Sequence, residues 1–340
     1  MEKKKILYLL SSNTFSGAEN VVCTIIDNLK NKYECLYCSP DGSIAETLKC
    51  KNIDFYPLKK FSYNEVKTAI REFNPDIIHA NDIKASVIAS FFSKKAKVVS
   101  HIHKNDPKLK SISIKSLIYY VRVHSFTNVI GVSDSIYNEF VFKKSLNGKY
   151  ITIPNYIDSN HIIDMANNGI SNEKYDCCYL GRLVDEKNPM FFIKIIKELT
   201  NEHKDIKAIM IGEGPMKEKC LSLITELGLD NNIKLIGFLS NPYPFLKNSK
   251  VCFMPSKYEG FGLVAIESLI LGVPVLNSGN GGLKEIFKND LEWYICNSIE
   301  EYVTKYKKIV NETNEKINLK SISSFTNLKK WRNKFEKIYQ

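Results

Sequence analysis

Two glutamates, Glu259 and Glu267, lie on either side of a glycine–aromatic–glycine turn in the stretch YEGFGLVAIE. Gly260 and Gly262 leave the backbone of this turn open, so that its N–H groups can approach a ligand closely. A helix is predicted to follow, and the N–H groups of residues 261–264 would then form an anion-binding nest at its N-terminus. Carboxylates accept hydrogen bonds from hydroxyls, and two of them could hold the two ends of a sugar diphosphate. A capping glutamate beside a surface glutamate is the simpler interpretation, but it leaves the glycines unexplained.

Two basic side chains occur in the turn GRLVDEKNP, which follows another apolar run. Arg182 and Lys187 combine a forked guanidinium with a compact ammonium, and together they would suit a diphosphate. From the spacing alone, a pair of surface charges is an equally good interpretation. The GEG sequence at 212–214 also follows an apolar run, and we interpret it as a tight turn only.

The first half of the chain has similar residues after its apolar runs. Gly17, in SSNTFSGAEN, lets the backbone approach a ligand at a helix N-terminus, although an ordinary capped turn explains it equally well. His79, His101 and His103 follow the runs DIIHAN and KVVSHIH, and His103 is the best placed of the three to point into a cleft. The GxGxxG fingerprint is absent here, which argues against a dinucleotide.

Short apolar runs alternate with longer amphipathic stretches, which is typical of buried parallel strands joined by crossover helices. The runs are KILYLL, ECLYCSP, DIIHAN, KVVSHIH, NVIGVS and YITIPN, and then YDCCYLGRL, IKAIMIGEG, IKLIGFL, VCFMPS and PVLNSG. Because the rhythm stops and restarts, the sequence predicts an α/β protein with two facing Rossmann-like, doubly wound parallel-sheet domains and a cleft between them. Ligands of such sheets bind at the carboxyl ends of the strands, where the residues described above lie.

The length of 340 residues suits about two domains. We expect an N-terminal domain at 1–155, a polar and irregular linker at about 154–174, and a C-terminal domain at 174–320. The stretch LKKWRNKFEKIYQ is predicted to form an amphipathic helix. We expect residues 321–340 to cross back to the N-terminal domain.

The composition excludes several classes of protein. Apolar residues make up 44% of the chain, which allows a sizeable core, and no run approaches the ~20 apolar residues of a membrane span. The apolar part of MEKKKILYLL is too short for a signal peptide, so no secretion is implied. Nine cysteines are scattered without CxxC or zinc-type spacing, so we expect a reducing cytoplasm and no structural metal site.

The net charge of +11 is concentrated in the first half, where residues 1–155 hold 23 Lys and Arg against 14 Asp and Glu. The densest segment, Lys84 to Arg122, holds nine basic residues and a single acid, Asp106. Such a field attracts anions, and we expect its lysines to bind an anionic membrane surface reversibly. A nucleic-acid partner is not expected, because recognition motifs and aromatic platforms are missing. We expect the apolar residues of this segment to pack inside the domain, namely most of Ile112, Ile114, Leu117, Ile118 and Val121.

Together these stretches resemble the retaining glycosyltransferases of family 4, the glycosyl transferases group 1, which have the GT-B fold. Their signature E-x7-E corresponds to Glu259 and Glu267, and the preceding Pro-Ser and the following G-x-P-V also match. The resemblance covers nearly the whole chain, through GAE, DIIHAN, IHKND, GVSDSI, IPNYID, GRLVDEKNP, IGEGP, IGF and the final helix. Two positions depart from the family pattern, since Ser16 and Tyr156 stand where glycines are usual, and neither departure removes a charged position.

The resemblance implies roles for the residues described above. Glu259 would contact hydroxyls of the donor sugar, and Glu267 would bind the ribose hydroxyls of the nucleotide. Arg182 and Lys187 would hold the diphosphate and stabilise it as it leaves, and His103 would meet the donor sugar from the N-terminal domain. The remaining binding positions are Gly17 near the phosphates, Gly237 and Phe238 beside the base, and Phe261, Gly262, Leu263 and Val264 along the hexose and phosphate.

The implied reaction moves a hexose-type sugar from a nucleotide diphosphate sugar, by default a UDP-sugar, to a glycan or lipid-linked acceptor in surface polysaccharide biosynthesis. It would retain the anomeric configuration, and it would need no metal and no cofactor besides the donor. The protein would be cytoplasmic and peripheral at the inner face of the cell membrane. Two alternatives share the fold, namely a sugar-nucleotide epimerase or hydrolase, and a catalytically inactive nucleotide-sugar-binding partner. The joint presence of Glu259, Arg182, Lys187 and His103 argues against the inactive partner.

Overall fold

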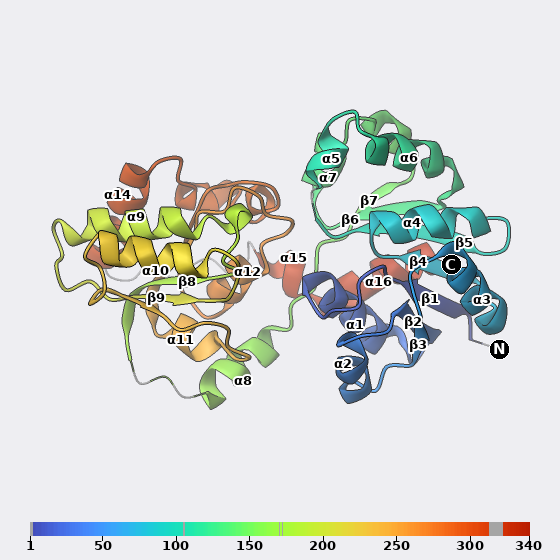
Figure 1. Ribbon diagram of the computed structural model, residues 1–340, viewed down its shortest axis with the longest axis horizontal. Coiled ribbons are helices and arrows are strands. Elements are labelled where there is room, and N and C mark those ends of the chain that lie inside the picture. Colours follow the sequence, from blue (N-terminus) through green and yellow to red (C-terminus); the bar gives the residue numbers. More distant parts are fainter. Residues whose placement is uncertain (1–2, 105, 170, 172, 313–321) are drawn as a thin grey trace. The chain divides into compact units, whose positions relative to one another are not determined.

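The structure is a computed structural model that describes residues 3–104, 106–169, 171, 173–312 and 322–340. The chain divides into two compact units, of which the first joins the residues up to Tyr156 with Asn327–Gln340 and the second is Ile157–Thr326. Each unit has one sheet of parallel strands with helices on both faces (Figure 1). The predicted fold class, an α/β protein with two doubly wound parallel sheets, is therefore confirmed. Within the described residues, no helix has the length and apolar character needed to cross a bilayer.

The first unit has a parallel sheet with the strand order β3-β2-β1-β4-β5-β6-β7. Its strands are β1 Lys5–Leu9, β2 Glu34–Pro40, β3 Phe55–Leu58, β4 Ile77–Ala80, β5 Lys97–Ile102, β6 Asn128–Gly131 and β7 Tyr150–Thr152. Its helices are α1 Gly17–Leu29, α2 Ile44–Cys50, α3 Tyr63–Phe73, α4 Ile83–Ala89, α5 Pro107–Lys110, α6 Ile114–Arg122, α7 Asp134–Glu139 and α16 Leu328–Tyr339, with short 3-10 turns η1 Ser90–Phe92, η2 Val123–Ser125 and η3 Lys143–Leu146. Strand β3, whose exposed Pro57 interrupts the apolar run, was not among the runs that the sequence indicated.

The strands are continuous apolar runs because helices cover both faces of the sheet. On β1, Ile6 and Tyr8 belong to the cluster that α1 and α16 complete, and the alternating Leu7 and Leu9 are buried on the opposite face. This arrangement leaves the loops at the strand ends as the positions where polar side chains can gather.

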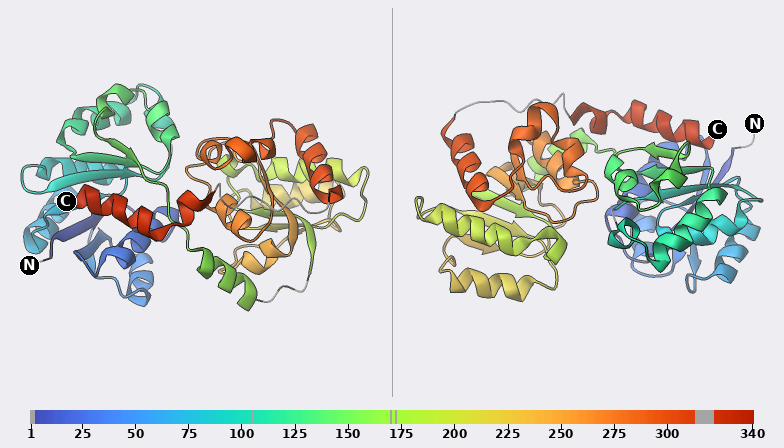
Figure 2. Two further views of the ribbon diagram at one scale, coloured as in Figure 1. Left: turned by 180° about the vertical axis from the view of Figure 1, so that it is seen from behind. Right: turned by 90° about the horizontal axis from the view of Figure 1, so that it is seen from above.

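Helix α16 lies along the elements of the first unit, although it follows the second unit in the sequence (Figure 2). Trp331, Phe335 and Tyr339 share one face of this helix and are buried in the core of the first unit. The indole Nε1 of Trp331 donates a hydrogen bond to the carbonyl of Pro154 at 2.9 Å. The amphipathic pattern of the final helix therefore buries its apolar stripe against β1 and α1.

The second unit has a parallel sheet with the strand order β10-β9-β8-β11-β12. Its strands are β8 Tyr175–Leu180, β9 Ala208–Ile211, β10 Ile233–Leu235, β11 Ser249–Met254 and β12 Val275–Asn277. Its helices are α8 Ser159–Asn168, α9 Pro189–Thr200, α10 Lys217–Glu226, α11 Tyr243–Lys247, α12 Leu263–Ile270, α13 Leu283–Ile286, α14 Ile299–Asn311 and α15 Ser323–Thr326, with 3-10 turns η4 Asp185–Lys187 and η5 Asn289–Tyr294.

The segment 154–174 differs from the irregular linker that its polar composition predicted. Asp158 caps the N-terminus of α8 by accepting hydrogen bonds from the backbone N–H groups of Asn160 and His161. Ile162 and Ala166 are buried, and the helix packs on α11 and α12. Helix α8 therefore makes this part of the chain an ordinary element of the second unit.

Both sheets change the direction of their strand order at one point. In the first unit this switch lies between β1 and β4, and in the second it lies between β8 and β11. The loops that leave such neighbouring strands diverge to opposite sides, so a ligand can bind at the carboxyl ends of the strands there. The loops after β8 and β11 contain Arg182, Lys187 and Glu259.

The expectation that most of the aliphatic residues of the segment 112–121 pack inside the domain is wrong. All five are exposed, namely Ile112, Ile114, Leu117, Ile118 and Val121. Helix α6 instead turns Ser116 and Tyr119 inward, and both are completely buried. The Tyr119 hydroxyl lies 2.8 Å from Ser100 Oγ, which lies 2.8 Å from Ser86 Oγ. A network of buried hydroxyls, rather than an apolar stripe, therefore sets the orientation of this helix.

Candidate active site

Lys187 and Glu259 meet at the switch point of the second sheet. Lys187 ends the turn η4 after β8, and Glu259 lies in the loop after β11. Lys187 Nζ forms an ion pair with Glu259 Oε2, and Ser256 Oγ donates a hydrogen bond to the same oxygen at 3.4 Å. Glu259 is buried and Lys187 is partly exposed, so the ammonium compensates a carboxylate that is largely removed from water.

Tyr179 fixes the loop that carries the two predicted cations. This residue is buried at the end of β8, and its hydroxyl donates to the carbonyls of Arg182 at 3.1 Å and Lys187 at 3.4 Å. Arg182 is exposed, and its guanidinium forms no hydrogen bond or ion pair with any described residue. The structure thus joins Lys187 to Glu259 and leaves the Arg182 side chain open to a ligand. Tyr179 was not foreseen, because a tyrosine inside a buried apolar run looks like part of the core.

The backbone of Glu259 rests on a second loop, residues 278–282, which follows β12. The Gly282 N–H donates to the Glu259 carbonyl at 3.0 Å. Gly281 has a φ of +60°, and a Cβ on it would lie 1.9 Å from the Glu259 carbonyl oxygen, so no larger residue fits this approach. Sequence reasoning missed this loop, although a glycine pair shortly after the run PVLN was a signal for it.

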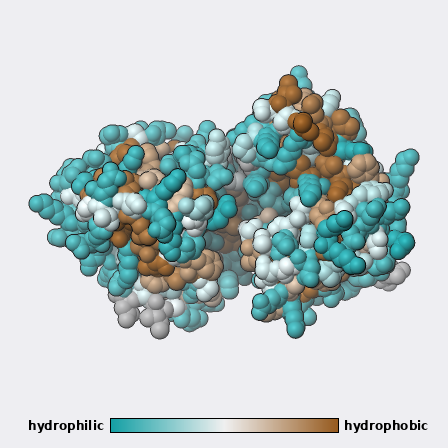
Figure 3. All heavy atoms as spheres, in the orientation of Figure 1, coloured by the Kyte–Doolittle hydropathy of each residue, from teal (hydrophilic) through white to brown (hydrophobic). Residues whose placement is uncertain are grey.

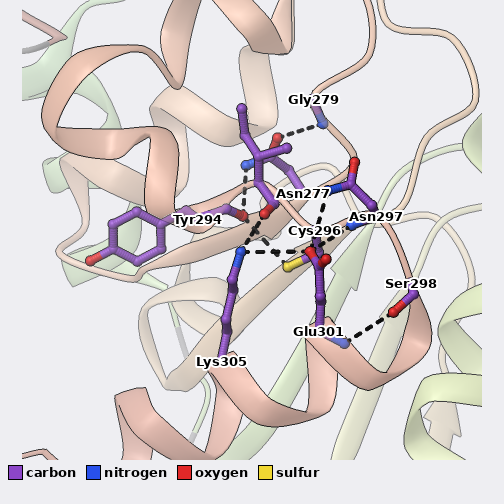
Figure 4. A network of polar contacts seen from close by, with 9 residues as sticks. Asn277, Gly279, Tyr294, Cys296, Asn297, Ser298, Glu301 and Lys305 are labelled. Carbon is purple, nitrogen blue, oxygen red and sulfur yellow. Dashed lines mark hydrogen bonds and ion pairs between the residues drawn. The ribbon is translucent and has the colours of Figure 1, made fainter.

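Asn277 fastens the start of this supporting loop (Figure 4). Its side-chain Oδ1 accepts a hydrogen bond from the Gly279 N–H at 2.9 Å, and its Nδ2 donates to the Tyr294 carbonyl at 3.3 Å. The Asn277 carbonyl accepts from the Cys296 N–H at 2.7 Å. Lys305, on α14, donates to the Ile295 carbonyl at 2.5 Å, and thereby ties the same segment to a helix. The loop beneath Glu259 is therefore held from the body of the second unit.

The turn between Glu259 and α12 depends on glycine, while the approach of its backbone to a ligand stays a prediction. Gly262 is the N-cap of α12 and has a φ of +97°, and a Cβ on it would lie 2.8 Å from a methyl carbon of Leu283. Phe261 is buried with its ring edge-on to Phe325 at 5.4 Å. Leu263 and Val264 begin the helix, where the geometry leaves backbone N–H groups without partners inside the helix.

Glu267 lies on α12, and among the described residues it has no hydrogen-bond partner in common with Glu259. The hydroxyl of Tyr243, on α11, donates to Glu267 Oε1 at 3.3 Å. Burial raises the pKa of Glu267 to about 7, and this effect exceeds that of the hydrogen bond from Tyr243, which lowers the pKa. The carboxyl group therefore changes its charge near neutral pH. Tyr243 was not among the predicted residues, because it begins a short helix with no motif around it.

Gly237 and Phe238 lie in the loop after β10. The Gly237 carbonyl accepts a hydrogen bond from the Gly212 N–H at 2.8 Å, and Phe238 is strongly exposed. Gly212 also contacts the loop after β8, since a Cβ on it would lie 1.9 Å from the Gly181 carbonyl oxygen. The GEG turn therefore joins the strand-end loops of β8, β9 and β10, which is more than the tight turn that the sequence suggested.

In the first unit, the geometry around His103 fixes its tautomer. Asn81 Nδ2 donates to the His79 carbonyl at 2.8 Å, which directs Asn81 Oδ1 to His103 Nε2 at 3.2 Å. Nε2 must then carry the proton, and Nδ1 of a neutral ring is an acceptor. Burial lowers the pKa of His103 to about 3, so the ring is neutral at physiological pH. Nδ1 is buried and has no partner in the described part of the chain.

His79 and His101 form a buried chain behind His103. The Tyr339 hydroxyl lies 2.5 Å from His79 Nδ1, and His79 Nε2 lies 3.2 Å from His101 Nδ1. The rings of His101 and His103 are 3.9 Å apart between centroids. Burial lowers the pKa of His79 to about 3 and that of His101 well below its usual value. Of the three predicted histidines, His103 alone keeps partial exposure, and the other two support it.

Gly17 is exposed at the first position of α1, and a Cβ on it would meet nothing within 4 Å. The Ser16 hydroxyl donates a hydrogen bond to the carboxylate of Glu19, which is buried in the first turn of the same helix. The close approach to a ligand predicted for Gly17 stays a prediction. Among the described residues, no group of three or more His, Cys, Asp or Glu side chains could hold a metal ion.

Two family profiles match the chain in succession. The profile described as Glycosyltransferase Family 4 matches residues 15–161, and the one described as Glycosyl transferases group 1 matches residues 161–323. The residues predicted to bind and react in the second unit, from Arg182 to Glu267, all lie within the second match.

Several curated proteins are similar over most of the chain. An uncharacterized glycosyltransferase of Methanocaldococcus jannaschii is 28% identical over 68% of this chain and 62% of its own length. The O-antigen biosynthesis glycosyltransferase WclY of Escherichia coli is 29% identical over 83% of this chain and 82% of its own. The N-acetylgalactosamine-N,N'-diacetylbacillosaminyl-diphospho-undecaprenol 4-alpha-N-acetylgalactosaminyltransferase of Campylobacter jejuni is 26% identical over 84% of this chain and 82% of its own.

Among solved structures, Anabaena HepE in complex with UDP superposes with a TM-score of 0.85. The two chains are 19% identical, and the match covers 98% of this chain and 99% of that one.

Proposed function

Because the chain belongs to the glycosyltransferases of group 1 and family 4, we propose that it moves a hexose-type sugar from a nucleotide diphosphate sugar to a glycan or lipid-linked acceptor. The reaction would retain the anomeric configuration and would serve the biosynthesis of a surface polysaccharide. The relatives support this direction, since WclY is named for O-antigen biosynthesis and the Campylobacter enzyme for a diphospho-undecaprenol substrate. HepE was solved with UDP, which supports UDP as the donor nucleotide.

The observation that carries the proposal is the meeting of Lys187 and Glu259 at the switch point of the second sheet. A diphosphate at this point would take the Lys187 ammonium as its partner and would also meet the open guanidinium of Arg182. Glu259 would then exchange the ammonium for hydroxyls of the donor sugar. The charge that develops on the leaving diphosphate would be stabilised by Arg182, Lys187 and the N-terminus of α12, so no metal is required for this step.

The other residues would bind and orient the donor. Glu267 would accept hydrogen bonds from the ribose hydroxyls, with Tyr243 as its anchor. The neutral His103 ring would meet the donor sugar through the part of it that remains exposed. The acceptor would attack from the face of the leaving group, with a diphosphate oxygen taking its proton. Glu259 is therefore a binding group and not a nucleophile.

The test is a screen of UDP, GDP and their sugars for thermal stabilisation of the protein. A donor at about 100 times its dissociation constant should add about 2.7 kcal/mol to the free energy of unfolding. The stabilising donor is then incubated with lipid-linked acceptors, with and without excess EDTA, and the anomeric configuration of the product is determined by NMR. A protein that no nucleotide sugar stabilises, or one whose activity disappears in EDTA and returns with magnesium, contradicts the proposal.

A lipid-linked acceptor would require the protein to work at a membrane. The exposed lysines of the first unit support a peripheral position at an anionic inner membrane face, as the charge of the segment Lys84 to Arg122 predicts.

A further inference from the structure

Helix α6 and the residue two positions before it present a row of apolar side chains to solvent, here called the α6 ridge. Its most exposed members are Ile114 at 79%, Ile112 at 72% and Val121 at 62%. The ridge consists of Ile112, Ile114, Leu117, Ile118 and Val121. Figure 3 shows hydrophobic residues gathered over the region where Figure 1 labels α5 and α6. A contiguous exposed apolar surface of this kind is typical of an interaction site.

The ridge cannot be buried by a rotation of the helix. The N-terminus of α6 is fixed by a capping box, in which Ser113 and Ser116 exchange hydrogen bonds between side chain and backbone. The opposite face places Tyr119 in its hydroxyl contact with Ser100. Turning the ridge inward would leave these buried hydroxyls unsatisfied, at a cost in stability for each. The fold therefore holds the apolar residues on the outside.

The apolar surface continues beyond α6. The guanidinium carbon of Arg122, the last residue of the helix, lies 3.8 Å from the ring centroid of Phe91. The Phe91 ring lies 5.8 Å from that of Tyr63, and both rings are exposed. Aromatic side chains beside a cationic side chain suit the boundary between water and lipid headgroups.

Positive charges outnumber negative ones around the ridge, and the two acids beside it, Asp106 and Glu139, are both paired. Lys110 forms an ion pair with Glu139 at 2.7 Å, and Lys115 forms one with Asp106. Lys104 and Lys108 are exposed and form no ion pair with any described residue. The exposed lysines of the segment 94–97, namely Lys94, Lys95 and Lys97, add to this field. The surface therefore combines exposed apolar side chains with a surplus of cations, which is the combination that an anionic bilayer complements.

We propose that the α6 ridge inserts into the surface of an anionic phospholipid bilayer, with the surrounding lysines on the lipid headgroups. This inference rests on the proposed function for the presence of a membrane-held acceptor, and it adds an apolar contact to an attraction that charge alone had suggested. If charge alone holds the protein on the bilayer, high salt should abolish binding. If the ridge also inserts, a fraction of the binding should persist when salt has fully screened the charges.

The experiment compares the unchanged protein with three variants in co-sedimentation with vesicles of phosphatidylglycerol and phosphatidylcholine. Ile114→Gln, Ile118→Gln and Val121→Gln together should weaken binding by at least about tenfold, and should remove the part that survives ~1 M salt. Lys104→Glu with Lys108→Glu should mainly weaken binding at low salt. The matched control is Ile163→Gln with Leu221→Gln, which changes side chains of the second unit that are 40% and 39% exposed and should have no effect.

Insertion is measured directly with Ile114→Trp, against Leu221→Trp as control. The tryptophan fluorescence of the Ile114→Trp variant should shift to the blue with anionic vesicles and should be quenched by brominated lipid. Equal binding by the triple glutamine variant, or no change in emission, overturns the proposal. Loss of dimerisation in that variant without an effect on vesicles would assign the ridge to a second copy of the chain instead. Thermal stabilisation by the donor nucleotide, measured without vesicles, reports on the proposed function separately.

Discussion

The ion pair between Lys187 and Glu259 joins two residues that lie 72 positions apart in the chain. The E-x7-E pattern singles out Glu259 and the GRLVDEKNP turn singles out Lys187, but neither motif indicates that the two side chains touch. Contacts of this kind depend on the register between strands, here between β8 and β11, which local sequence does not encode. The residue types of the candidate site could therefore be predicted, while their partners could not. Tyr179, Tyr243 and Asn81 were also missed, because their role is to hold other residues of the site in place, and no motif indicates such a role.

The first prediction concerns the cations. Lys187→Ala should lower turnover by ~100-fold or more, because removing a group that stabilises developing charge typically costs ~3 kcal/mol. Lys257→Ala is the matched control, since Lys257 pairs with Asp185 at 2.7 Å beside the same loop and has no proposed role. Initial rates at saturating donor decide the matter. Equal rates for both variants would remove Lys187 from the site.

The second prediction concerns the ionisation of Glu267, whose pKa is raised to about 7. The carboxyl group is charged above this value and protonated below it. Affinity for the donor should therefore fall as the pH decreases from 8 to 6, because the carboxylate is the better acceptor for ribose hydroxyls. Isothermal titration with the nucleotide sugar at these two pH values measures the effect. Glu267→Gln should bind weakly and equally at both, and a retained pH dependence in this variant would assign the titration to another group.

At the scale of elements, most helices and strands could be predicted because their hydrophobic periodicity matches their structure. Helix α6 shows the limit of this reasoning. Periodicity indicates that Ile114, Leu117, Ile118 and Val121 share a face, but it does not indicate which face is buried. The inward orientation depends on the contact between Tyr119 and Ser100, and Ser100 lies on a different element, β5. The same limit applies to α8, whose polar composition concealed a capped helix.

The third prediction concerns the attachment of α16 to the first unit. Tyr339→Phe should lower the free energy of unfolding by about 1–3 kcal/mol, because it leaves His79 Nδ1 buried without its partner. Tyr37→Phe is the matched control in the same unit. The Tyr37 hydroxyl is buried and has no partner among the described residues, so its removal should be neutral or stabilising. Denaturant titrations of both variants provide the comparison, and an equal loss in both would contradict a specific role for the Tyr339 hydroxyl.

At the scale of the whole molecule, the buried histidines make stability depend on pH. His79 and His103 have pKa values lowered to about 3, and that of His101 is also well below its usual value. In the unfolded chain each would titrate near ~6.5, so between these values the unfolded state binds more protons. The contribution of the three histidines to the free energy of unfolding is therefore fully present above pH ~6.5. It decreases as the pH falls, by up to ~1.4 kcal/mol per pH unit for each histidine. Glu267 has the opposite effect, because its pKa is raised to about 7 in the folded protein, so that its contribution to stability increases as the pH falls towards the pKa of the unfolded chain. It is a single group, whereas three histidines contribute in the other direction.

The measurement is urea unfolding at pH 7, 6 and 5. In His79→Gln an amide can replace the ring in its hydrogen bonds. The free energy of unfolding of this variant should depend less on pH, by about the contribution of one histidine. An unchanged slope in this variant would show that His79 takes up a proton in the folded protein.

The doubly wound architecture of both units could be predicted because alternation of apolar runs with amphipathic stretches has few other solutions. The expectation that residues 321–340 cross back to the first unit does not follow from this alternation. The amphipathic pattern of α16 indicates that Trp331 and Phe335 are buried, but several surfaces could receive them. The contact of Trp331 with the Pro154 carbonyl shows which surface does, and no feature of the local sequence contains that information.

The attachment of α16 to the first unit also sets an order of events during synthesis. The ribosome must complete the whole of Ile157–Thr326 before it makes any part of α16, which supplies Trp331, Phe335 and Tyr339 to the core of the first unit. The second unit is continuous in sequence and can fold as soon as it emerges. The first unit, although made earlier, must wait with part of its apolar core open to water and to chaperones. The unit that is translated first is therefore the one that finishes folding last.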